Sequence, residues 1–211
     1  MTNASRRYHQ LVLIWIRDPA MFAAYLRDLP PIVARYGGAA DLSLRPTAIW
    51  ADGLTLPDVV NLVHYDDREA YQRFNADPDF QAIEHLRTSS VDLMTFEGYL
   101  STTDPAPAGS PERIYNVEVA TWRDGTGEAY RAYEERGEAR MREYGYRVEY
   151  VLATETAPAG RPHPDVVKIS SFRDEAARAA FDADPAHSEI EEKLYPAAAD
   201  NVVWLTGHAI G

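Results

Sequence analysis

Residues 74–84 read FNADPDFQAIE, and residues 181–191 read FDADPAHSEIE. Six of the eleven aligned positions are identical. PDVV at 57–60 recurs as PDVV at 164–167, and the spacing between these two copies is the same as between the two longer phrases. A chance repeat would reproduce one motif, whereas several motifs in the same order indicate a tandem duplication.

Further matches support the duplication. Tyr8 and Trp15 match Tyr115 and Trp122 at the same spacing. Two other matches are slightly further apart, as small insertions between equivalent elements would cause: Tyr36-Gly37 with Tyr144-Gly145, and Gly98 with Gly207. We therefore expect two copies of one structural unit, over residues 1–100 and 113–211. The Pro- and Ser-rich stretch 101–112 (STTDPAPAGSPE) is the expected linker.

The two halves predict the same order of elements. Short β-branched and aromatic runs predict strands, and apolar residues at helical spacing predict helices. In the first half we expect strands at 8–16, 42–50, 58–65 and 94–100, and helices at 19–36, 67–75 and 78–90. In the second half we expect strands at 114–122, 147–155, 165–172 and 202–209, and helices at 126–144, 174–182 and 185–195.

Proline residues mark several helix boundaries. Pro30-Pro31 should break or kink the first helix, because proline lacks the N–H group and clashes with the preceding turn. In the repeated phrase, Asp77-Pro78 and Asp184-Pro185 each combine an N-cap aspartate with proline at the first helical position. We expect these Asp-Pro pairs to be structural.

Composition excludes several classes of function. The sequence contains no cysteine, which rules out disulfides, thiolate nucleophiles and zinc–thiolate sites. The net charge of −12 argues against a nucleic-acid partner, since phosphate binding needs a concentrated basic surface. No apolar run is long enough to span a membrane, and the protein is expected to be cytoplasmic. Dinucleotide, P-loop and nucleophile-elbow motifs are absent, so no cofactor is expected. His187 and Glu191, four positions apart, do not by themselves make a metal site.

The β-α-β-β-α-β order is the ferredoxin-like arrangement. The phrases DPAMFAAYLRDLPPIVARYGG (18–38), PDVVNLVHYDDREAYQRFNADPDFQAIEHLR (57–87) and FEGYL (96–100) resemble the dimeric α/β-barrel superfamily. Repeat two departs from this pattern, with Tyr144-Gly145-Tyr146 in place of YGG and Lys193 near the place of Arg87. The resemblance implies an α+β fold in which two ferredoxin-like βαββαβ repeats of one chain close a pseudo-dimeric barrel. A monomer with this intrachain barrel is expected, although a higher oligomer remains an alternative.

Strand parity suggests where a site would lie, because alternate residues of a strand face opposite sides. One set of faces is uniformly apolar, and we expect it to carry the helices: Val12, Ile14, Val60, Leu62, Val117, Val119, Val167 and Ile169. The opposite faces carry polar groups and are expected to line the barrel interior. There Glu118 and Lys168 would lie on adjacent strands as an ion pair, with a structural role as the alternative to a catalytic one. His64 falls on the helix-facing parity and is expected to be a core residue.

The candidate residues combine acids, bases and aromatic walls, as proton transfer on an organic molecule requires. The candidate catalytic residues are His9, Glu118, Lys168, Tyr99 and His208. The candidate substrate-binding residues are Trp15, Asn61, Tyr65, Arg87, Glu97, Asn116 and Trp122.

The resemblance allows several functions, because the superfamily includes cofactor-free monooxygenases, cyclases, isomerases and lyases, haem enzymes and binding proteins. We expect a cofactor-independent acid/base enzyme (a cyclase, isomerase or lyase) acting on a hydrophobic aromatic or polyketide-like metabolite. A cofactor-free monooxygenase and a non-catalytic binding protein are the alternatives. A haem enzyme would need an axial ligand, for which His9, His64 and His208 are candidates.

Overall fold

The computed structural model describes residues 6–51, 53–101 and 110–210. The first repeat consists of β1 (Tyr8–Ile16), α1 (Pro19–Asp28), α2 (Pro30–Ala34), β2 (Ala39–Ala51), β3 (Val59–Tyr65), α3 (Arg68–Asn75), α4 (Pro78–Ser90) and β4 (Val91–Leu100). The second repeats this order: β5 (Ile114–Trp122), α5 (Gly127–Arg142), β6 (Arg147–Thr156), β7 (Val166–Phe172), α6 (Glu175–Asp182), α7 (Pro185–Glu189), η1 (Ile190–Leu194), α8 (Tyr195–Ala198) and β8 (Ala199–Ala209). The predicted fold class is confirmed, and so is the break at Pro30-Pro31, where α1 gives way to α2. Most of the predicted linker lies outside the described residues.

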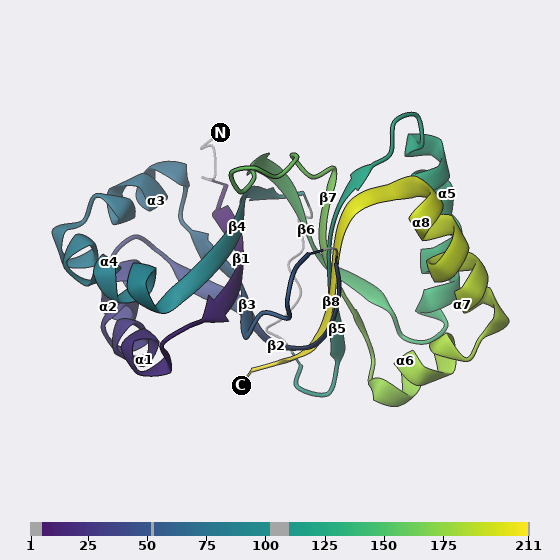
Figure 1. Cartoon of the computed structure of the whole chain (residues 1–211), viewed down its shortest axis with the longest axis horizontal. Helices are drawn as coiled ribbons and strands as arrows, with labels where there is room; N and C mark the ends of the chain where they lie inside the picture. The colour runs from purple at the N-terminus through teal and green to yellow at the C-terminus, as the bar shows by residue number, and fades with distance from the viewer. Residues whose placement is uncertain (1–5, 52, 102–109, 211) are drawn as a thin grey trace, which may run out of the picture.

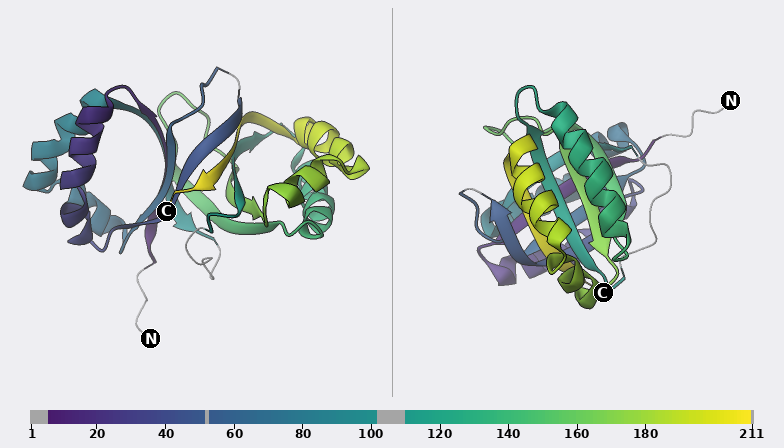
Figure 2. Two further views of the ribbon diagram at one scale, coloured as in Figure 1. Left: turned by 90° about the horizontal axis from the view of Figure 1, so that it is seen from below. Right: turned by 90° about the vertical axis from the view of Figure 1, so that its right-hand side faces the viewer.

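The strands form one closed antiparallel barrel in the order β1-β3-β2-β8-β5-β7-β6-β4. The four strands of each repeat are neighbours around the barrel, and the pairings β2–β8 and β4–β6 join the two repeats. The helices of the first repeat cover one side of the barrel and those of the second cover the opposite side (Figures 1 and 2). In the described part of the chain every strand is therefore paired on both sides, and closure removes the exposed sheet edges through which chains associate.

The barrel interior is an apolar core to which all eight strands contribute. It includes Leu11 and Leu13 from β1, Leu62 from β3, and Val117 and Val119 from β5. Two further cores lie between the sheet and the helices, one in each repeat. Because both faces of the sheet are covered, both are largely apolar along most strands.

This arrangement corrects the predicted strand faces. Six of the residues expected beneath the helices point into the barrel instead: Val60, Leu62, Val117, Val119, Val167 and Ile169. Glu118, Lys168 and their polar neighbours lie on the helix side. His64 was also assigned to the wrong face, since it shares the parity of Val60 and Leu62 on β3.

The first strand shows how such an error arises. Leu62 of β3 pairs with Leu11, and the equivalent Ile169 of β7 pairs with Val117. Leu62 and Ile169 are separated by the common spacing of the repeats, whereas Leu11 and Val117 are separated by one position fewer. The match of Tyr8 with Tyr115 is therefore one position out of register, and such a shift turns every side chain of a strand to the other face.

The repeated Asp-Pro phrase ties the helices of each repeat together. Asp77 accepts hydrogen bonds from the backbone N–H groups of Asp79 and Phe80 at the start of α4. The same carboxylate accepts from the Tyr36 hydroxyl at 2.6 Å and pairs with Arg35 at 2.8 Å. One aspartate thus caps α4 and anchors the end of α2.

Asp184 has the same function in the second repeat. It caps α7 by accepting from the Ala186 N–H group at 2.8 Å. It also accepts hydrogen bonds from the hydroxyl of Tyr144 and the guanidinium of Arg140 near the end of α5. The phrase occurs twice because each repeat needs the same junction between its helices.

Candidate functional site

Glu118 and Lys168 form the predicted ion pair on adjacent strands, but between the sheet and α5 rather than inside the barrel. Lys168 Nζ lies 3.1 Å from Glu118 Oε2, and both side chains are almost completely buried. The Tyr130 hydroxyl donates to Glu118 Oε1 at 2.9 Å. Burial alone would lower the pKa of Lys168, but Glu118 and other nearby acidic groups raise it above its ordinary value. The ammonium group therefore remains charged and held in place.

A cleft opens on the outer face of the barrel at the junction between the repeats, and one of its lining residues, Trp204, is paired with Glu118 across β8 and β5. Its volume is about 480 Å³, and β2 of the first repeat forms one wall with β8 of the second. Trp50 and Trp204 are paired across these two strands. The Tyr195 ring meets Trp204 edge to face, with ring centroids 5.2 Å apart. These three rings give the cleft flat aromatic walls suited to a planar ligand.

The opposite wall of the cleft carries three ionisable side chains from α6, α7 and η1. His187 Nδ1 lies 3.5 Å from Glu191 Oε2, and Arg178 Nη2 donates to the same carboxylate oxygen at 2.9 Å. The His187 ring is packed edge to face against Phe181, at a centroid distance of 5.4 Å. A base, a carboxylate and a guanidinium thus lie side by side against the aromatic walls.

Polar atoms in this group are buried without a hydrogen-bond partner. Among the described residues of this group, Glu191 Oε1, Arg178 Nη1 and His187 Nδ1 have none. Buried polar atoms are normally satisfied, so such atoms at a cleft indicate that a ligand or water completes the site. Burial raises the pKa of Glu191, although Arg178 and His187 act against that rise. A perturbed carboxyl in a cleft is typical of a functional site.

A π-helical turn sets the position of Glu191. In the first repeat α4 is a regular helix, but the corresponding segment of the second repeat contains η1. Pro78 and Pro185 are separated by the common spacing of the repeats, whereas Val91 and Ala199, which start the following strands, are separated by one position more. The π-turn accommodates this extra residue, and such turns occur frequently at functional sites.

The candidate residues of the first repeat do not line the cleft. Glu97 accepts hydrogen bonds from Tyr8, Gln10, Tyr71 and Thr156, so its carboxylate is held as a structural acceptor between sheet and helices. Tyr99 packs edge to face against Tyr8.

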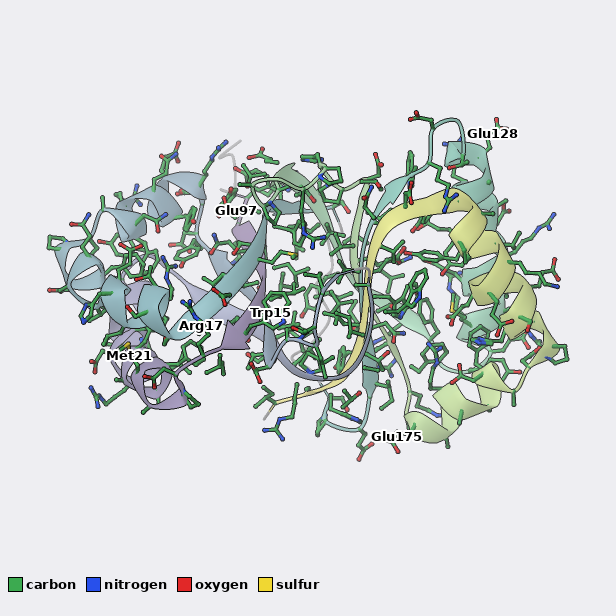
Figure 3. The ribbon with its side chains drawn as sticks, viewed as in Figure 1. Trp15, Arg17, Met21, Glu97, Glu128 and Glu175 are labelled. Carbon is green, nitrogen blue, oxygen red and sulfur yellow. The ribbon has the colours of Figure 1, made fainter. Side chains whose placement is uncertain are left out.

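Other candidates of the first repeat also have structural partners. The Trp15 Nε1–H group donates to the Thr55 carbonyl at 3.0 Å. Figure 3 shows Trp15 and Glu97 toward opposite ends of their neighbouring strands. Tyr65 is buried in the aromatic core beneath the helices, and Arg87 pairs with Glu84 at 2.8 Å. Asn61 lies on the helix-facing side of β3, between Val59 and Val63, which pack against the same core.

The remaining candidates belong to the second repeat and do not form the walls of the cleft. Asn116 is buried on β5, and its Oδ1 accepts from Thr206, which does line the cleft, at 3.3 Å. Trp122 is partly exposed at the end of β5 and packs against Tyr130. His208 lies near the end of β8, 3.6 Å from Glu175.

The sequence contained a signal for some of the residues that were missed. His187 and Glu191 are four positions apart, which places them on one face of a helix. That spacing was weighed only as a metal site, for which a pair is too small. Trp50 and Trp204 come from different repeats, and only the pairing of β2 with β8 brings them together.

The histidines named for haem ligation do not fit a haem bound in the cleft. His9 and His64 both contact Asp41 at the barrel, and His208 is not among the residues that line the cleft. His187 does line the cleft, but carboxylates flank both of its ring nitrogens, with Glu191 beside Nδ1 and Glu192 4.0 Å from Nε2. None of the three histidines named as haem ligands therefore lines the cleft.

Solved structures share this architecture along almost the whole chain. An anthrone oxidase-like protein matches with a TM-score of 0.60 at 16% identity, covering 98% of this chain and 92% of the other. The chain has the dimeric α/β-barrel fold. A chlorite dismutase variant from Candidatus Nitrospira defluvii matches this α/β barrel with a TM-score of 0.57 at 12% identity, covering 96% and 92% of the two chains. A proposed monooxygenase from Lactobacillus acidophilus NCFM matches with a TM-score of 0.54 at 10% identity, covering 97% and 94%.

The match to a sequence family covers a smaller part of the chain than the structural matches do. Residues 9–99, within the first repeat, match a family model described as a domain of unknown function, DUF1330. The search of curated proteins finds no match. Among the described residues, no helix has the length and apolar character needed to cross a membrane.

Proposed function

We propose that the protein is an enzyme that binds a flat, largely aromatic small molecule in the cleft of the second repeat and catalyses proton transfer on it. The observation that carries this proposal is the convergence of His187, Glu191 and Arg178 on a cleft with tryptophan and tyrosine walls. Glu118 and Lys168 support the site from behind rather than reacting.

The proposed step removes a proton from carbon next to a carbonyl group. The Nε2 atom of His187 accepts the proton, so the C–H bond breaks and an N–H bond forms. Glu191, with Oε2 3.5 Å from Nδ1, stabilises the positive charge that develops on the ring. The electron pair moves onto the carbonyl oxygen, and the unpartnered Nη1 of Arg178 is a suitable hydrogen-bond donor to that oxyanion. Return of the proton elsewhere gives isomerisation, loss of a leaving group gives elimination, and attack on a second carbonyl gives cyclisation.

An oxygenase is the second candidate, because the same carbanion can transfer an electron to molecular oxygen. The likeness in fold to an anthrone oxidase-like protein and a proposed monooxygenase favours considering it. It requires no change in the roles of His187 and Arg178. Oxygen uptake coupled to loss of the carbon acid distinguishes this candidate from simple proton transfer.

Anthrone is a suitable first probe, since it is a flat tricyclic ketone with an acidic methylene group. We would follow exchange of its methylene protons in D2O by NMR, with an oxygen electrode in parallel. We expect His187→Gln to lower the catalysed exchange rate about 10²–10⁴-fold. Glu84→Gln is the matched control, because Glu84 occupies the position of Glu191 in the first repeat and pairs with Arg87 on a partly exposed surface.

The outcomes separate the function classes. Exchange without oxygen uptake supports an isomerase, lyase or cyclase, and exchange with uptake supports an oxygenase. If anthrone and related carbon acids quench the fluorescence of Trp50 and Trp204 but show no catalysed exchange, the protein is a binding protein and the proposed function is wrong.

A further inference from the structure

A second group of polar residues lies in the first repeat, at the end of the barrel where β1 begins. His9 on β1 and His64 on β3 are paired across their strands, and the two residues are 5% and 7% exposed. Asp41 is the extra residue of a β-bulge in β2, between Ala40 and Leu42. Bulges redirect a side chain, and here the bulge brings the Asp41 carboxylate to both imidazoles.

The three side chains are close enough to share one metal ion. Asp41 Oδ2 lies 3.4 Å from His9 Nε2 and 2.9 Å from His64 Nδ1. One ligand atom from each residue lies within 4.8 Å of the other two. Two ligands bound about 2.1 Å from a tetrahedral zinc ion are about 3.4 Å apart, so His9 and Asp41 already have the required spacing. His64 needs to move outward by only about half an ångström to reach the same spacing.

The two neighbours of the His9 ring are compatible with a metal ion between His9 and Asp41. Its Nδ1 lies 3.1 Å from the Arg7 carbonyl oxygen, and its Nε2 faces the Asp41 carboxylate. Both neighbours are hydrogen-bond acceptors, but a neutral imidazole carries only one N–H group. Donation from Nδ1 to a backbone carbonyl leaves Nε2 as a free electron pair directed at Asp41. This is the arrangement that metal-bound histidines usually show.

The second repeat neutralises the same bulge differently. Glu149 is the extra residue of the bulge in β6, between Val148 and Tyr150. Its carboxylate pairs with Arg147 at 2.6 Å and Arg113 at 3.4 Å, and also accepts from the Ser171 hydroxyl. The protein therefore supplies permanent positive charge to Glu149. The ion pairs that Asp41 makes with described residues are only those with the two histidines.

We propose that His9, Asp41 and His64 bind a divalent first-row transition-metal ion, with Zn²⁺ or Fe²⁺ as the best matches to a set of two histidines and one carboxylate. This site is separate from the cleft of the second repeat and goes beyond the proposed function. Burial of both histidines and the bulge at Asp41 pre-organise the three ligands.

Titration of the EDTA-treated full-length protein with Co²⁺ and Zn²⁺ tests the site directly. We expect one equivalent of Co²⁺ to bind with visible d–d absorption bands, and Zn²⁺ to displace it. Asp41→Asn and His64→Gln should each weaken binding at least tenfold. Glu149→Gln is the matched control, because it alters the equivalent bulge of the second repeat and should leave binding unchanged.

A variant that gains a new absorption band is a stronger test, because loss of metal binding alone could also result from loss of the fold. The natural chain has no cysteine, so His64→Cys introduces a unique thiol. Cobalt bound at the proposed site should then show thiolate charge-transfer absorption in the near ultraviolet, which the His187→Cys variant should lack. Absence of stoichiometric binding, or Co²⁺ bands that survive His64→Gln and disappear with His187→Gln, would overturn the proposal. The latter result would assign the metal to the group Asp182, His187 and Glu191.

Discussion

Asp77 and Asp184 show how much one residue type contributes at equivalent positions of a duplicated fold. Each caps a helix, and each is bound by a tyrosine and an arginine at the end of an earlier helix, α2 in the first repeat and α5 in the second. The hydrogen bond from Tyr36 lowers the pKa of Asp77 below its ordinary value of 3.8, and the bond from Tyr144 does the same for Asp184. The cap itself could be predicted from Asp-Pro, but the tyrosine and arginine partners depend on how the helices pack.

The lowered pKa values give a pH prediction. A carboxyl with a folded-state pKa below its unfolded value stabilises the fold above the unfolded value. That stabilisation is lost as the pH falls below about 4 and through the folded-state pKa. We expect Asp77→Asn and Asp184→Asn, which preserve a capping side chain, to flatten the decline in melting temperature between about pH 4 and about pH 2.

Alanine at the same positions should have a larger effect at neutral pH. Asp77→Ala removes the cap as well as the charged acceptor, and should lower the melting temperature by about 2–5 °C. Gln81→Ala is a suitable control, because Gln81 is an exposed residue of the same helix. Thermal unfolding followed by circular dichroism measures both, and equal effects of the two variants would contradict the assigned role of Asp77.

At the scale of elements, the sequence predicts positions well and faces poorly. The strands β1 and β5 have the predicted bounds, and most other boundaries agree closely. The prediction of which strand face points into the barrel was wrong because hydrophobicity cannot identify the interior when a sheet is covered on both sides. The Glu118–Lys168 pair was found from strand adjacency alone. Its position beneath α5 depended on the face and was missed.

Removing one member of that pair should destabilise the contact between β5, β7 and α5. Lys168→Met leaves Glu118 buried without its counter-charge, which costs about 3–5 kcal/mol of unfolding free energy. The double variant Glu118→Gln/Lys168→Met should recover most of this loss, because glutamine still accepts the Tyr130 hydrogen bond. Urea denaturation measures both variants. A single variant as stable as the natural protein would show that the pair is not buried as described.

The π-turn η1 gives a second prediction at this scale. Deleting the exposed Glu192 should restore a regular helix like α4, since it removes the extra residue of the second repeat. The deletion rotates His187 and Glu191 by about 100° relative to α8. We expect a folded protein whose tryptophan fluorescence no longer responds to anthrone. Unchanged anthrone binding would indicate that the cleft does not depend on the π-turn.

For the whole molecule, closure of the barrel within one chain decides the assembly. The pairings β2–β8 and β4–β6 use the edges through which a single repeat would bind a second copy. We therefore expect native mass spectrometry to show a monomer of 23.7 kDa. Residues 1–100 expressed alone should form a homodimer, because the same edges and the apolar interior are then exposed. A monomeric first repeat would contradict this view of closure.

Closure also means that the repeats cannot melt one at a time. Unfolding of either repeat breaks both the β2–β8 and the β4–β6 pairings and opens the shared interior. The chain should therefore lose its structure in one cooperative step. A ligand held in the second repeat would then slow hydrogen exchange at the buried amides of β1 and β3, on the far side of the barrel. The covalent link has turned two copies of a fold into a single thermodynamic unit, in which one repeat supports the stability of a site it does not contain.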